Sequence, residues 1–158
     1  MTELVKQTVC FTGHREIPVL RLLAVKRKLR KTVEELINQG YCFFGTGGAL
    51  GFDTLAAQTV LDLRKTHFQV KLILVLPYKS QAARWTDGDK EVYESIKEQA
   101  DKVVYTSEEY TKGCMFKRNR YLVDHSSVCV CYLDKGTGGT AYTVKYAISN
   151  GLKTLNIV

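Results

Sequence analysis

Two glycine clusters in this sequence each follow an apolar run and precede a helical pattern, an arrangement that can bind phosphate. The first, residues 45–51, follows the apolar residues 41–44 and leads to Phe52 and Asp53. Glycine lets backbone N–H groups approach a phosphate, and the positive end of a helix dipole favours its negative charge. The spacing is neither the dinucleotide GxGxxG pattern nor a P-loop, because no Lys-Ser/Thr pair follows. A glycine-rich turn without a ligand is the alternative.

The second cluster, residues 136–140, opens a helix predicted over 141–149. The amides of Gly138 and Gly139 and the hydroxyl of Thr140 could hold a second phosphate or a ribose. A third segment, Thr12-Gly13-His14-Arg15, follows the apolar residues 7–11.

Arg15 could bind a phosphate with two parallel hydrogen bonds. His14 could contact a ribose or base, or transfer protons. A turn in which both side chains only pair with neighbouring residues is the competing interpretation.

Three further residues could reach the same ligand. Asp53 stands at the start of a helix, where it acts either as an N-cap or as an acceptor for a ribose hydroxyl. Arg118 and Asn119 lie on a helix before the second glycine cluster, and a solvated basic helix is their alternative role. Trp85 offers either a stacking surface or core packing. The candidate ligand-binding residues are therefore Thr12, Gly13, His14, Arg15, Gly47, Gly48, Ala49, Gly51, Asp53, Arg118, Asn119, Gly138, Gly139 and Thr140.

Strand and helix patterns alternate along the whole chain, which predicts a Rossmann-like, doubly wound α/β fold with a mostly parallel sheet and helices on both faces. Ligands of such sheets bind at the carboxyl ends of the strands, so the three candidate segments should gather at one edge. We expect the N-terminus to enter its first strand directly. The expected strands are 7–11, 41–44, 70–76, 102–105, 127–132 and 154–158, and the expected helices are 19–38, 54–65, 90–100, 115–124 and 141–149.

Length and composition predict one cytoplasmic domain over residues 1–158. No apolar run approaches the ~20 residues of a membrane span, and no signal-peptide pattern is visible. The five cysteines lie outside any metal-ligand spacing and are expected mainly as buried thiols. No metal or cofactor is therefore expected to be required.

The formal net charge of +7 indicates an anionic partner. Part of it lies in residues 26–31, a stretch that is expected to be the solvated face of a helix. A nucleic-acid patch is the alternative for this segment.

Several motifs together resemble the YpsA-like family of the SLOG superfamily, which also contains DprA and the lysine-decarboxylase-like phosphoribohydrolases. The motifs are Thr12-Gly13-His14-Arg15, residues 47–53, Gln81 with Trp85, Arg118-Asn119-Arg120 with Asp124, and residues 138–142. The resemblance implies a Rossmann-like fold and a pocket for a nucleotide or a nucleotide-derived ligand. It also implies a bacterial or phage origin.

Catalysis is left open by the same resemblance. Phosphoribohydrolases share a PGGxGTxxE motif with a catalytic glutamate, whereas Thr137 and Lys145 replace its proline and its glutamate here. We therefore expect binding of a nucleotide, or of an NAD- or ADP-ribose-like molecule, with sensing as the role. The alternatives are an N-glycosidase using Asp53 or Asp124, and DprA-like binding of single-stranded DNA. A homo-oligomer is also compatible with the sequence.

Overall fold

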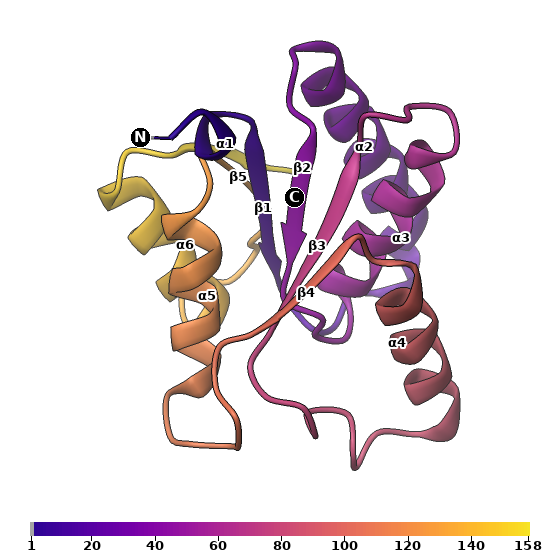
Figure 1. The fold of residues 1–158 in the computed structure, drawn as a ribbon, viewed down its shortest axis with the longest axis vertical. Helices are drawn as coiled ribbons and strands as arrows, with labels where there is room; N and C mark the ends of the chain where they lie inside the picture. The colour runs from indigo at the N-terminus through magenta and orange to yellow at the C-terminus, as the bar shows by residue number, and fades with distance from the viewer. Residues whose placement is uncertain (1) are drawn as a thin grey trace.

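The structure is a computed structural model that describes residues 2–158. Six parallel strands form one sheet in the order β4-β3-β2-β1-β5-β6 (Figure 1). The strands are β1 (Thr8–Gly13), β2 (Phe43–Thr46), β3 (Lys71–Leu76), β4 (Lys102–Tyr105), β5 (Val128–Tyr132) and β6 (Lys153–Asn156). The predicted parallel sheet is confirmed.

Helices cover both faces of the sheet, which confirms the doubly wound arrangement. In Figure 1, α2, α3 and α4 lie on one side of the sheet, and α5, α6 and the short α1 lie on the other. The helices are α1 (Glu3–Lys6), α2 (Val19–Asn38), α3 (Phe52–Arg64), α4 (Asp87–Gln99), α5 (Cys114–Asp124) and α6 (Gly139–Ser149). None of the helices in residues 2–158 combines the length and apolar character that crossing a bilayer requires.

The four inner strands β1, β2, β3 and β5 are largely buried, and their side chains alternate between two cores, whereas the edge strands β4 and β6 are partly exposed. In β3, Leu72, Leu74 and Leu76 pack with α2 and α3, whereas Val75 joins the core under α5 and α6. In β5, Cys129 and Cys131 belong to this second core, so these thiols act as small hydrophobic groups, as predicted. Burial raises the pKa of the Cys131 thiol to about 11.

Some predicted boundaries were wrong. The N-terminus forms the one-turn helix α1 before β1, because Thr2 Oγ1 accepts a hydrogen bond from the Val5 amide at 3.3 Å and caps it. Strand β2 begins at Phe43 instead of Tyr41. Helix α2 has the predicted bounds, since Pro18 precedes it and apolar residues repeat at helical spacing.

The sheet order places a topological switch point between β1 and β5. Through α2, α3 and α4 the chain moves outward from β1 to β4, and α5 then returns it to the other side of β1. The loops that follow β1, β2 and β5 consequently meet at the carboxyl ends of adjacent strands, where doubly wound folds bind ligands.

Candidate functional site

A cavity of about 270 Å³ lies at the switch point and is formed by four segments. They are the turn after β1, the loop after β2, the first turns of α5 and the loop before α6. The residues lining it are Thr12, Gly13, His14, Arg15, Ala49, Asp53, Met115, Phe116, Arg118, Asn119, Thr137, Gly138, Gly139 and Thr140. The three predicted segments therefore do gather at one edge, although Gly47, Gly48 and Gly51 do not line the cavity.

The glycines of the first loop serve close packing. Gly47 is buried, and a Cβ placed on it would lie 2.6 Å from Nη1 of Arg118. Gly51 has a φ of 77°, and a Cβ there would overlap the backbone of Arg15. Phe52 adds a hydrogen bond from its amide to the His14 carbonyl at 3.1 Å. This loop thus holds the turn after β1 in place, and only Ala49 and Asp53 of it reach the cavity.

The second glycine loop is open by contrast. A Cβ on Gly136, Gly138 or Gly139 would meet no atom within 4 Å. Gly138 precedes α6 and supplies no side-chain cap. The first amides of a helix have no partner within the helix, so the N-terminus of α6 presents free donors to an anion in the cavity.

Arg118 is the buried cation of the site, with only 4% of its surface exposed. Its Nη1 donates to the Gly47 carbonyl, and its Nε donates to Asn119 Oδ1 at 2.7 Å. Burial lowers the pKa of the Arg118 guanidinium, while the nearby charge of Asp53 opposes this shift. A buried guanidinium without a full counter-charge favours the binding of an anion.

Asp53 is buried in the same cavity and is not the N-cap of α3, which was one of its two expected roles. Gly51 is the N-cap of α3, and the Asp53 carboxylate instead accepts the Ala49 amide at 3.2 Å. Burial raises the pKa of Asp53, and the charge of Arg118 opposes this effect. The ion pairs within 4 Å among residues 2–158 include neither Asp53 nor Arg118.

His14 and Arg15 differ in their availability. His14 Nε2 lies 3.0 Å from both the amide nitrogen and Oδ1 of Asp134, so this ring is already paired. Arg15 is exposed, and the ion pairs formed within residues 2–158 do not include it. Its guanidinium is therefore free to meet a ligand at the cavity.

A chain of hydrogen bonds connects Arg118 with the second glycine loop. Asn119 accepts from Arg118 and donates through Nδ2 to Thr143 Oγ1 at 2.9 Å. Thr143 in turn donates to the Gly139 carbonyl at 2.9 Å. Asn119 thus has a positioning role in addition to lining the cavity, and Thr143 is a part of the site that the sequence did not indicate.

Other residues considered in the sequence lie elsewhere. Asp124 accepts a hydrogen bond from the Tyr146 hydroxyl at 2.7 Å, and it does not line the cavity. Trp85 packs edge-on against Tyr93 at 5.2 Å between ring centroids, so it is a partly buried residue that packs against the core. Lys145 is exposed on α6. Met115, Phe116 and Thr137 line the cavity although sequence reasoning did not select them.

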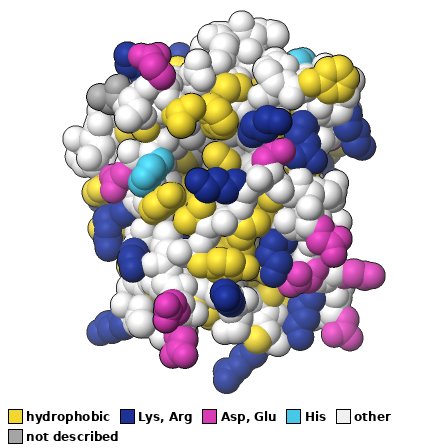
Figure 2. All heavy atoms as spheres, viewed as in Figure 1, with side chains coloured by type: hydrophobic (Ala, Val, Ile, Leu, Met, Phe, Trp, Pro, Cys, Tyr) yellow, Lys and Arg dark blue, Asp and Glu magenta, His cyan; other side chains and the backbone are white. Residues whose placement is uncertain are grey.

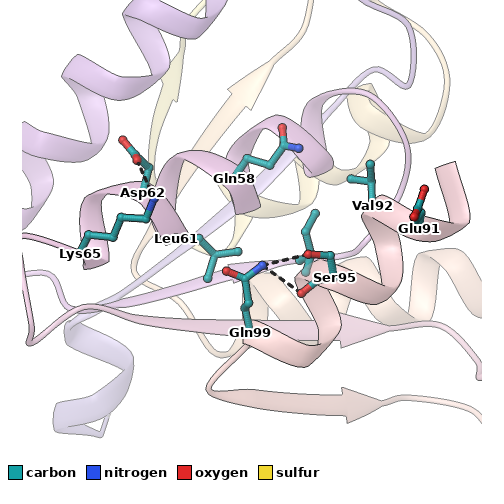
Figure 3. A pocket seen from close by; sticks show the side chains of 9 residues that line it. Gln58, Leu61, Asp62, Lys65, Glu91, Val92, Ser95 and Gln99 are labelled. Carbon is teal, nitrogen blue, oxygen red and sulfur yellow. Dashed lines mark hydrogen bonds and ion pairs between the residues drawn. The ribbon is translucent and has the colours of Figure 1, made fainter. Parts of the chain in front are cut away.

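Two other hollows lack this combination of groups. One of about 450 Å³ lies between α3 and α4, where Asp62 pairs with Lys65 and Gln99 bonds to Ser95 (Figure 3). Another of about 300 Å³ is mostly apolar and lies over β2, β3 and β4 beside α5. Figure 2 shows hydrophobic side chains in a band on this face. Residues 2–158 contain no group of three or more His, Cys, Asp or Glu side chains that could hold a metal ion.

Comparisons with known proteins agree with this architecture. The sequence model of the YspA SLOG family matches residues 10–155. The uncharacterized SPbeta prophage-derived protein YoqJ of Bacillus subtilis is 34% identical over 139 residues, which cover 80% of this chain and 81% of YoqJ.

Two solved structures share the fold. DprA from Streptococcus pneumoniae is 17% identical, with a TM-score of 0.67, over 96% of this chain and 50% of DprA. This chain therefore spans about half the length of that protein. DprA from Helicobacter pylori, described with its single-stranded DNA binding mode, is 21% identical, with a TM-score of 0.57, over 94% of this chain and 66% of that protein.

Proposed function

The chain belongs to the YspA SLOG family, and we propose that its cavity binds a nucleotide or a nucleotide-derived molecule through a phosphate group. One observation carries this proposal: the buried Arg118, the unpaired Arg15 and the uncapped N-terminus of α6 converge on a single cavity. Each of these three features favours a negative charge, and each comes from a different part of the chain. Binding without turnover, as in a sensor, requires no catalytic group in addition to these three features.

The size of the cavity favours one nucleotide unit. Its volume of about 270 Å³ is near the lower end of small-molecule pockets, which start at roughly 300 Å³. A second hollow of about 520 Å³ shares His14 and Arg15 with it and extends past Pro18. A longer ligand such as ADP-ribose or NAD would occupy both hollows, with Arg15 between its two halves.

A thermal-shift screen tests the proposal. The ligands are AMP, ADP-ribose, NAD, a cyclic dinucleotide and a short single-stranded DNA. A ligand at 100 times its Kd stabilises the fold by about 2.7 kcal/mol, which is readily measured. We expect a nucleotide to raise Tm for the wild type and for Arg27→Ala, an exposed arginine outside the cavity, but not for Arg15→Ala. A screen without any shift would contradict the proposal.

Cleavage of an N-glycosidic bond is a second candidate function, favoured by Asp53. This is the one carboxylate among residues 2–158 that lines the cavity, and its raised pKa suits an acid that gives up a proton during catalysis. Chromatography of the incubated nucleotide separates the two functions. Release of free base by the wild type, but not by Asp53→Asn, would establish the glycosidase.

Binding of single-stranded DNA is the third candidate, and the relevant feature is the basic surface of α2. Lys26, Arg27, Lys28 and Lys31 are exposed there, whereas Arg30 is paired with Glu34 and Asp62. DNA binding through this surface would weaken steeply with salt. Glutamine at the four exposed positions should then lower DNA affinity and leave nucleotide affinity unchanged.

A further inference from the structure

Two partly exposed aromatic side chains contact each other, and one of them, Phe116, lines the cavity. Phe116, in the first turn of α5, lines the cavity and is 39% exposed. Tyr142, in the first turn of α6, is 42% exposed, and its ring lies 4.7 Å from that of Phe116 at an angle of 64°. A contacting pair of exposed aromatic rings beside a polar cavity is an apolar surface that a ligand can use.

The pair is held in place from both helices. The Tyr142 hydroxyl accepts a hydrogen bond from Nη1 of Arg120 at 3.1 Å. This bond ties α6 to α5, and the edge-to-face contact then supports the Phe116 ring. An aromatic ring that is fixed before binding loses little conformational entropy when a ligand stacks on it.

Phe116 also lies beside the groups that favour anions. It lines the same cavity as Arg118 and Thr140. One cavity therefore presents a charged, hydrogen-bonding part and an aromatic part. A molecule that joins a phosphate to a flat ring matches both, whereas inorganic phosphate or a sugar phosphate matches only the first.

We infer that Phe116 is a stacking platform for the base of the bound nucleotide and that the edge-to-face contact with Tyr142 supports its ring. This inference rests on the proposed function, because it assigns the aromatic part of the same site. Stacking uses the π-face that every base has, so Phe116 contributes affinity without selecting among bases. Discrimination between bases has to come from hydrogen bonds elsewhere.

Titration calorimetry on Phe116→Ala and the wild type tests the inference. The probes are AMP, GMP, CMP and UMP, with ribose 5-phosphate as the matched ligand without a base. Phe68→Ala is the matched control, because Phe68 is 83% exposed and lies outside the cavity. Circular dichroism confirms the fold of each variant.

Phe116→Ala should lower the affinity for nucleoside monophosphates about 10-fold or more and leave the affinity for ribose 5-phosphate unchanged. Phe116→Trp should restore nucleotide binding, since its ring is also a stacking surface, and Phe68→Ala should bind as the wild type does. If Phe116→Ala lost the same affinity for ribose 5-phosphate as for the nucleotides, or lost affinity for neither, the stacking role would be overturned while the proposed function would stand. A wild type that binds none of the four nucleotides would overturn the proposed function and this inference together.

Discussion

The guanidinium of Arg118 lies where a side chain on Gly47 would have to be. Its Nη1 donates to the Gly47 carbonyl, and a Cβ on Gly47 would be 2.6 Å from Nη1 and 2.8 Å from Cζ of the same group. The two residues are far apart in sequence, and they come from the loop after β2 and from α5. The cation of the site can be buried only because position 47 has no side chain.

Gly47→Ala should therefore destabilise the protein and displace Arg118. Overpacking of this kind costs about 1–3 kcal/mol. The matched control is Gly136→Ala, which meets no atom within 4 Å and should leave the free energy of unfolding nearly unchanged. Urea denaturation measures both variants. Equal stability of the two variants would show that the Arg118 side chain moves aside without cost.

Arg118→Met should weaken anion binding while keeping much of the buried volume. The variant leaves the Gly47 carbonyl without its donor, and we expect a loss of about 1–3 kcal/mol in the free energy of unfolding. Calorimetry with AMP should show at least a 10-fold loss of affinity, compared with no change for Arg27→Ala. If Arg118→Met bound AMP with wild-type affinity, Arg118 would have no role in binding the ligand.

Asp53→Asn should change how stability depends on pH. Burial raises the pKa of Asp53 in the folded protein above the ordinary value of 3.8. Between these two values the folded state holds more protons than the unfolded state, so the contribution of Asp53 to stability falls as pH rises. The asparagine does not ionise, and it still offers an oxygen to the Ala49 amide.

Denaturation of the wild type and of Asp53→Asn at several pH values from 4 to 8 measures this difference. The variant should gain stability relative to the wild type as pH rises through the window and then level off. A relative stability that falls with pH would mean that Arg118 stabilises the ionised carboxylate more strongly than burial opposes it.

Thr143→Val should weaken the site without touching the ligand. The change keeps the shape of the side chain but breaks the bond from Asn119 and the bond to the Gly139 carbonyl. We expect a loss of about 1–3 kcal/mol in stability, because Thr143 is buried, together with a lower affinity for AMP. Thr59→Val is the control, since Thr59 bonds only to the Leu55 carbonyl of its own helix. Matching effects in the two variants would contradict a role for the chain of hydrogen bonds.

The sequence was sufficient to predict the sheet and the place of the cavity. Alternating patterns gave the order of elements, and Pro18 with the helical repeat gave the bounds of α2. Parallel strands have their carboxyl ends on one edge, so Thr12, Asp53 and Gly138 were correctly expected to lie together. These conclusions need only local preferences and general rules of chain topology.

The details that the sequence did not reveal depend on contacts between distant segments. A glycine in the first loop allows either a phosphate or another part of the protein to approach the backbone closely. At Gly47 the group that approaches is the Arg118 side chain. Phe116 lines the cavity and contacts Tyr142 of α6, and local spacing on α5 cannot predict a contact with a different helix. Asp124 looked like a second carboxylate of the site, yet the turn of α5 directs it to Tyr146.

The pairing of β1 with β5 also determines when the site can exist during synthesis. The first strand emerges early from the ribosome, but its neighbour begins only at Val128, and the α6 amides follow later still. Because synthesis adds about 5–20 residues per second, the edge of β1 that pairs with β5 stays unpaired for roughly 5–25 seconds. A nascent chain that ends before α6 has Arg15 but lacks the second glycine loop, so the proposed anion site is incomplete until α6 has been made.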